Sequence, residues 1–155
     1  WLCHYVLGLT IGAAAAGGWI AVTGSFAPTA YALWAGVGLW IAGFDILYAT
    51  QDYTFDRAHG VKSIPARFGI PQALRVARAS HLLAWLAFLW AGVSYGAGPL
   101  YYLGLLLVGG LLLLEHRLVS PEDLSKVEVA FFQANVGVSL GMFLFIVLDL
   151  LARGA

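Results

Sequence analysis

The sequence predicts an all-α protein, a polytopic bundle of transmembrane helices in a single domain over residues 1–155. Hydrophobic residues make up 61% of the 155 residues and charged residues only 10%, and the mean hydropathy is +0.86. Soluble domains carry about 25% charged residues, so this composition excludes an ordinary soluble domain. The apolar residues fall into five runs, each long enough to cross a bilayer as a helix of about 20 residues. The formal net charge of zero gives no indication of a nucleic-acid partner.

The first predicted span ends at the turn Gly24–Pro28 and carries small residues at four-residue spacing, namely Gly8, Gly12 and Ala16. This spacing is typical of a face that packs closely against another helix. A second interpretation is that the small residues leave room for a lipid-like substrate. The five predicted spans cover residues 2–23, 31–50, 72–93, 99–114 and 129–148.

Helix start and stop signals mark the later spans. The second span is expected to continue as a helix to His59, with Gly60 as its C-cap. The third begins after a Gly-Ile-Pro turn, and Pro99 suits the first position of the fourth. Ser120 as N-cap and Pro121 at the first helical position predict the start of the helix that carries the fifth span.

The basic residues predict the orientation. Only Arg153 lies on one side, and the other seven of the eight basic residues follow the second or the fourth span. By the positive-inside rule, the loop over residues 51–71 and the loop after the fourth span face the cytoplasm. The seven residues are Arg57, Lys62, Arg67, Arg75, Arg78, Arg117 and Lys126.

Three carboxylates stand at the end of the second span, after 44 residues without any Asp, Glu, Lys or Arg. Carboxylates are costly beside an apolar span, so their presence indicates a function. In a continuous helix Asp52 and Asp56 lie one turn apart, and Asp45 falls near the same face. Since stacked like charges repel, we expect a positive partner between them, and a divalent metal carrying a phosphate is the obvious candidate.

Lys62 and Arg67 follow this acidic cluster and are candidate phosphate-binding residues, one as a point charge and the other as a fork. The alternative is an ordinary solvated loop. The four histidines show no metal-ligand spacing and are interpreted as isolated polar residues near helix ends or between helices. Glu115, His116 and Arg117 are interpreted mainly as a solvated helix end.

The run from Asp45 to Gly69 resembles the second aspartate-rich motif of UbiA-type intramembrane prenyltransferases. The matching residues are Asp45, the pair Asp52 and Asp56, and the stretch Gly60-Val-Lys62-Ser63-Ile-Pro65. The stretch Ala130–Gly137 is also similar to the last helix of that family. The resemblance covers essentially the whole chain, as the final five helices of a nine-helix fold.

This resemblance implies transfer of a polyprenyl group from polyprenyl diphosphate to an aromatic acid, 4-hydroxybenzoate or a naphthoate, in ubiquinone or menaquinone biosynthesis. It implies Mg²⁺ held by Asp52 and Asp56, and diphosphate bound by Lys62 and, less directly, by Arg67. Asp45 matches an additional catalytic aspartate that binds metal or orients the acceptor. The expected setting is the bacterial inner membrane, among its lipids, with the active-site loop in the cytoplasm.

The resemblance also implies that four N-terminal helices of the same protein, with an opposing Asn-Asp-x-x-Asp motif, are missing from this chain. We therefore expect these residues alone to be inactive. Two other functions fit spaced intramembrane aspartates: an ion-coupled transporter and a CDP-alcohol phosphotransferase. The basic residues beside the cluster favour a phosphate ligand over a transported ion, and the chain lacks the Asp-Gly-x-x-Ala-Arg pattern of the phosphotransferases.

Overall fold

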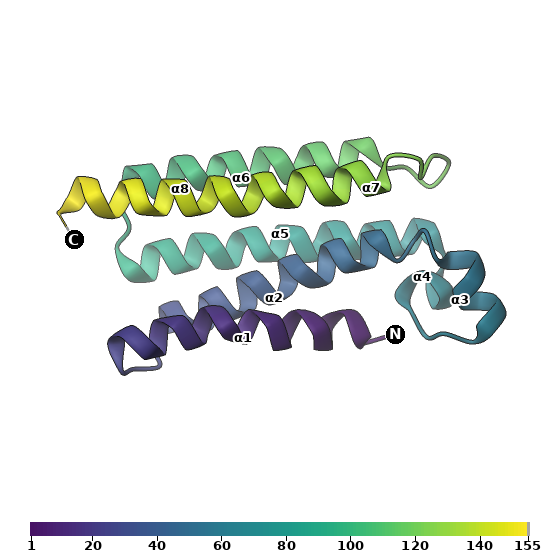
Figure 1. The fold of residues 1–155 in the computed structure, drawn as a ribbon, viewed down its shortest axis with the longest axis horizontal. Helices are drawn as coiled ribbons and strands as arrows, with labels where there is room; N and C mark the ends of the chain where they lie inside the picture. The colour runs from purple at the N-terminus through teal and green to yellow at the C-terminus, as the bar shows by residue number, and fades with distance from the viewer. Residues whose placement is uncertain (155) are drawn as a thin grey trace.

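The computed structural model describes residues 1–154, with the backbone alone at Phe131, and every regular element in that part of the chain is helical. The five span-length helices of the described chain lie roughly side by side (Figure 1). All five are long and apolar enough to cross a membrane, which confirms the predicted fold class. They are α1 (Cys3–Thr23), α2 (Pro28–Tyr48), α5 (Ile70–Tyr95), α6 (Pro99–Leu118) and the continuous rod of α7 (Val127–Val129), η1 (Ala130–Ala134) and α8 (Asn135–Arg153).

The second span does not continue as one helix to His59, so this prediction is wrong. Helix α2 ends at Tyr48, successive turns follow, and a separate helix α3 occupies Tyr53–His59. The Thr50 hydroxyl donates to the Leu47 carbonyl over 2.7 Å, a local bond that competes with continuation of the helix. Gly60 does cap α3, with φ of 71°, as its missing Cβ permits.

The predicted helix start at Ser120 is also wrong, because the helix begins at Val127. Ser120 and Asp123 instead exchange two backbone hydrogen bonds of 3.1 and 3.2 Å, which close a turn. The Asp123 carboxylate accepts from both the hydroxyl and the amide of Ser125. These bonds lower the pKa of Asp123. Polar side chains in this loop therefore satisfy each other locally.

Close packing joins α1 to α2. The residues of α1 that are buried are His4, Gly8, Gly12 and Ala16, one every four residues. A Cβ at Gly8 would meet the carbonyl group of Gly38 and the backbone nitrogen of Ala42, both in α2. The predicted packing face is confirmed, and the backbone of α2 fills the space beside Gly8 that the lipid-substrate interpretation required.

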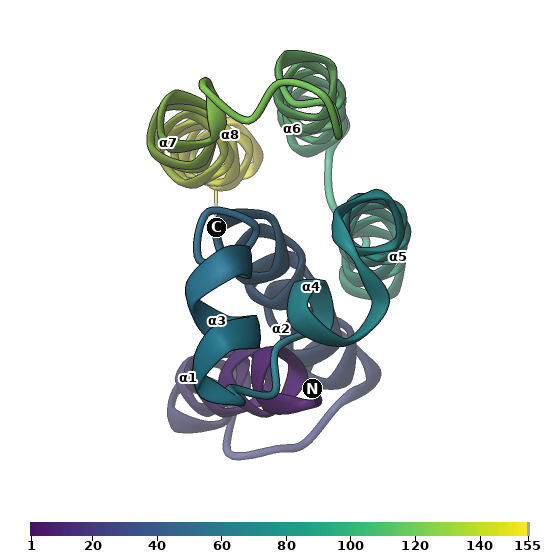
Figure 2. The same cartoon turned by 90° about the vertical axis from the view of Figure 1, so that its right-hand side faces the viewer.

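Viewed along the helices, α2 stands between α1 and α5 (Figure 2). Helix α6 lies next to α5, and α8 lies next to α6. Two short helices, α3 and α4 (Ile64–Phe68), sit at the end of the bundle where α2 finishes and α5 starts (Figure 1). Ile64 anchors this end by joining a core cluster with Leu47, Leu74 and Val127. Hydrophobic burial thus fixes the segment that carries the acidic motif against the ends of three long helices.

Candidate functional site

The three predicted carboxylates lie on two elements, α2 and α3, at one end of the bundle. Asp45 is in the last turn of α2, Asp52 is the N-cap residue of α3, and Asp56 is within α3. The amide of Asp56 donates to the Asp52 carbonyl over 2.8 Å, so these two residues do stand one helical turn apart. Because α2 ends at Tyr48, Asp45 is not on the same helix as Asp52 and Asp56. The prediction that the three carboxylates share one helical face is therefore wrong.

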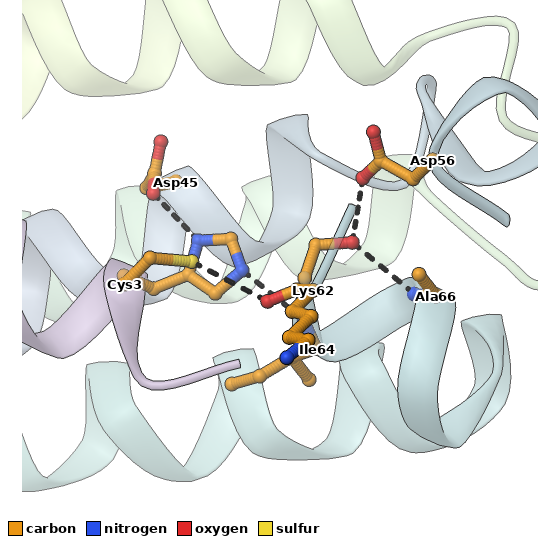
Figure 3. Close-up of polar contacts among 8 residues, drawn as sticks. Cys3, Asp45, Asp56, Lys62, Ile64 and Ala66 are labelled. Carbon is orange, nitrogen blue, oxygen red and sulfur yellow. Dashed lines mark hydrogen bonds and ion pairs between the residues drawn. The ribbon is translucent and has the colours of Figure 1, made fainter. Parts of the chain in front are cut away.

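Asp56 is held in place by the start of α4. Its carboxylate accepts a hydrogen bond of 2.6 Å from the Ser63 hydroxyl, and Ser63 in turn accepts from the Ala66 amide at 3.2 Å (Figure 3). Ser63 is therefore the N-cap of α4. Asp56 is only 7% exposed. In Figure 3 the second carboxylate oxygen of Asp56 points away from the dashed hydrogen bond, so it takes no part in that bond.

Asp45 has a partner that the sequence interpretation missed. Nδ1 of His4, in the first turn of α1, lies 2.6 Å from Oδ2 of Asp45. Nε2 of the same ring accepts a hydrogen bond of 3.2 Å from the Ile64 amide. Since Nε2 is an acceptor, the ring proton is assigned to Nδ1, which donates to the carboxylate. A single imidazole thus links α1, α2 and the start of α4 (Figure 3 shows Asp45 and Ile64).

One sequence signal could have identified His4. It is an ionisable side chain within an otherwise apolar run, and a buried polar group of this kind requires a hydrogen-bond partner. His4 is 4% exposed, whereas His59 lies on the surface of α3. The interpretation of the histidines as isolated is therefore wrong for His4, and it is also wrong for His81 and His116, whose nitrogens Nδ1 and Nε2 lie 2.9 Å apart.

Asp56, Lys62 and Arg67 line one small pocket of about 250 Å³. Arg57 lines it as well, so three cationic side chains and one carboxylate share the pocket. The Arg67 guanidinium is placed by stacking over the Trp1 ring, 5.4 Å from its centroid. Asp45 and Asp52 are not among the residues that line this pocket. The structure therefore brings together three of the five predicted site residues.

This pocket suits a phosphate group better than a metal bound by protein alone. Within residues 1–154, no group of three or more His, Cys, Asp and Glu side chains is arranged to hold a metal ion. Mg²⁺, however, commonly takes one or two carboxylates and completes its shell with phosphate oxygens and water. Asp56, with Asp52 one turn away, fits such a partial ligand set, while Lys62 and Arg67 fit the phosphate.

Comparisons with known proteins point in one direction. Residues 1–146 match the UbiA prenyltransferase family. A 4-hydroxybenzoate octaprenyltransferase of Nitrosospira multiformis is 34% identical over 122 residues, which is 76% of this chain and 40% of that protein. The corresponding protein of Methylococcus capsulatus is 34% identical over 145 residues, covering 88% of this chain and 48% of the relative.

A solved structure agrees with the sequence comparisons. The apo structure of a UbiA homologue from Aeropyrum pernix K1 superposes with a TM-score of 0.81 at 31% identity. The match covers 96% of this chain and 56% of that one. The chain thus spans about half the length of the relatives that it matches.

Proposed function

This chain belongs to the UbiA prenyltransferase family, and on that premise we propose that it is part of an enzyme that transfers a polyprenyl group from polyprenyl diphosphate to an aromatic acid. The proposed acceptor is 4-hydroxybenzoate or a naphthoate, on the route to ubiquinone or menaquinone. Relatives named 4-hydroxybenzoate octaprenyltransferase support the first acceptor. The proposed setting is the bacterial inner membrane, with residues 51–71 on the cytoplasmic side.

The observation that carries this proposal is the pocket shared by Asp56, Lys62 and Arg67. Cationic side chains beside a fixed carboxylate are suited to a diphosphate that arrives with a divalent cation. We assign Lys62 and Arg67 to the diphosphate, as a point charge and as a bidentate fork. Burial of Asp56 and its bond from Ser63 hold the carboxylate in one orientation before any ligand binds.

Asp52 and Asp56 are the proposed Mg²⁺ ligands. When bound, the metal would supply Lewis-acid stabilisation of the charge on the departing diphosphate. Asp45 is the third proposed catalytic residue. His4 holds its carboxylate at the end of α2, where it would orient the acceptor or assist the metal site. The apolar helices around the site would exclude water, which would otherwise compete with the acceptor ring.

The proposed active site is completed by helices outside this chain. Two carboxylates and a phosphate pocket make half of a metal site, and the relatives are about twice as long as this chain. We propose that four preceding helices of the same protein supply an opposing aspartate-rich motif. The chain by itself is then expected to give no Mg²⁺-dependent turnover.

The experiment is a prenyl-transfer assay of the full-length protein in lipid nanodiscs, with polyprenyl diphosphate, Mg²⁺ and each acceptor in turn. Asp52→Ala and Asp56→Ala are expected to lower turnover about 100-fold or more, because each removes charge stabilisation that the reaction requires. Asp123→Ala, in an exposed loop, is the matched control and should retain activity. Retained turnover in either motif variant would remove that aspartate from the site.

A further inference from the structure

A groove between α5 and α6 has no part in the proposed reaction. It encloses about 830 Å³, and none of its lining residues lines the pocket of Asp56, Lys62 and Arg67. Most of its wall is apolar. The side chains that define its long walls are Leu82 and Trp85 of α5 and Leu106, Leu112 and Leu113 of α6.

Two adjacent glycines create the groove. A Cβ at Gly109 would lie 3.0 Å from the indole nitrogen of Trp85, so α6 approaches that ring closely. The indole in turn donates to the Leu105 carbonyl over 2.9 Å, which fixes it as one wall. Beside it, Gly110 faces open space, with nothing within 4 Å of an added Cβ. The groove is thus a fixed feature of the packing between the helices.

One end of the groove is cationic. Arg78 and Arg117 line it together with His116, and Arg78 donates to the His116 carbonyl over 3.5 Å. His116 also contacts His81, at 2.9 Å between Nε2 and Nδ1. The neighbouring Glu115 is completely buried, so the interpretation as a solvated helix end is wrong for Glu115, whereas Arg117 is exposed. Oε2 of Glu115 lies 3.5 Å from Nδ1 of His81 in α5.

The dimensions of the groove match one leaflet of a bilayer. Arg117 is in the last turn of α6, at the end of the bundle where seven of the eight basic residues lie. From Arg117 to Leu106 the helix rises about 16 Å at 1.5 Å per residue. Half of a hydrocarbon core is about 15 Å thick. The cationic end therefore lies at the level of lipid headgroups when the leucines lie among acyl chains.

We propose that this groove binds a phospholipid with an anionic headgroup from the leaflet at the basic end of the bundle. Arg78 and Arg117 would hold the headgroup phosphate, since basic pockets between transmembrane helices at this level favour anionic lipids. One acyl chain would lie along Leu82, Leu106 and Leu113. Among the described residues, none that lines the groove carries a carboxylate, and the nearby Glu115 carboxylate is buried behind His81. A metal-borne diphosphate, the substrate of the proposed reaction, is therefore not the ligand that this lining favours.

The test uses the full-length protein in detergent, titrated with phosphatidylglycerol or phosphatidylcholine, with bound lipid counted by native mass spectrometry. The unmodified protein is expected to prefer phosphatidylglycerol about tenfold. The double variant Arg78→Gln and Arg117→Gln should lose that preference while keeping its affinity for phosphatidylcholine. Arg75→Gln, on the same helix but outside the groove, is the matched control and should keep the preference.

A second variant tests the apolar part of the groove. Gly110→Leu places a side chain in open space, so the protein should fold and should bind both lipids more weakly. If the double variant does not fold, the single variant Arg117→Gln replaces it in the comparison of the two lipids. The proposal is overturned by equal affinity for the two lipids, by an equal loss in Arg75→Gln, or by displacement of phosphatidylglycerol from this groove by polyprenyl diphosphate.

Discussion

Removal of His4 provides a quantitative test of how the acidic motif is attached to the bundle. In His4→Ala, the Asp45 carboxylate loses a partner at 2.6 Å and the Ile64 amide loses its acceptor. Interhelical side-chain hydrogen bonds in membrane proteins contribute about 0.6 kcal/mol on average and reach about 1.7 kcal/mol. The His4 side chain is 5% exposed and that of Asp45 is 31% exposed. Because the acceptor is a carboxylate and the donor is buried, we expect a coupling energy of about 1–2 kcal/mol.

Each single variant also leaves one buried donor unpaired, at a cost of about 1–3 kcal/mol. In His4→Ala this donor is the Ile64 amide, and in Asp45→Ala it is the Nδ1–H of the buried His4 ring. His4→Ala should therefore lower the free energy of unfolding by about 2–5 kcal/mol in total.

The assay is reversible unfolding in mixed micelles, applied to both single variants and to the double variant. The coupling energy is the amount by which the double variant departs from the sum of the single variants. His59→Ala is the matched control, since His59 lies on the exposed surface of α3, and its effect should stay within about 0.5 kcal/mol. A coupling energy below about 0.3 kcal/mol, or a cost for His4→Ala no larger than for the control, would refute the reasoning.

Two further predictions concern packing and the pocket. Gly8→Ala should destabilise the bundle by about 1–3 kcal/mol, because the added methyl meets the Gly38 backbone, which cannot rotate away. Gly17→Ala, with open space beside it, should be neutral or stabilising; equal effects in micelle unfolding would contradict the packing. Ser63→Ala removes the bond that orients Asp56, and about a tenfold rise in the Mg²⁺ concentration needed for half-maximal prenyl transfer is expected. An unchanged Mg²⁺ requirement would exclude that positioning role.

The candidate site was partly predictable from the residues alone. The acidic motif with Lys62 and Arg67 was identifiable because those residues are close in sequence, and the structure places Asp56, Lys62 and Arg67 in one pocket. Ser63 lies in the same stretch, as a serine before an Ile-Pro pair. The contact from His4 to Asp45 spans 41 residues and the contact to Ile64 spans 60, and no local pattern specifies which distant groups will meet.

The sequence by itself determined the five helices, because a run of about 20 apolar residues in a membrane must satisfy its backbone hydrogen bonds internally. It also determined the close packing of the first helix, since small residues every four positions form one face. The end of α2 at Tyr48 is accompanied by a local bond of Thr50, which the apolar pattern did not show. The tertiary structure alone decided that Glu115 is buried and that a histidine of α1 holds Asp45 beside the motif. Both depend on contacts between segments far apart in the chain, which propensity and spacing do not encode.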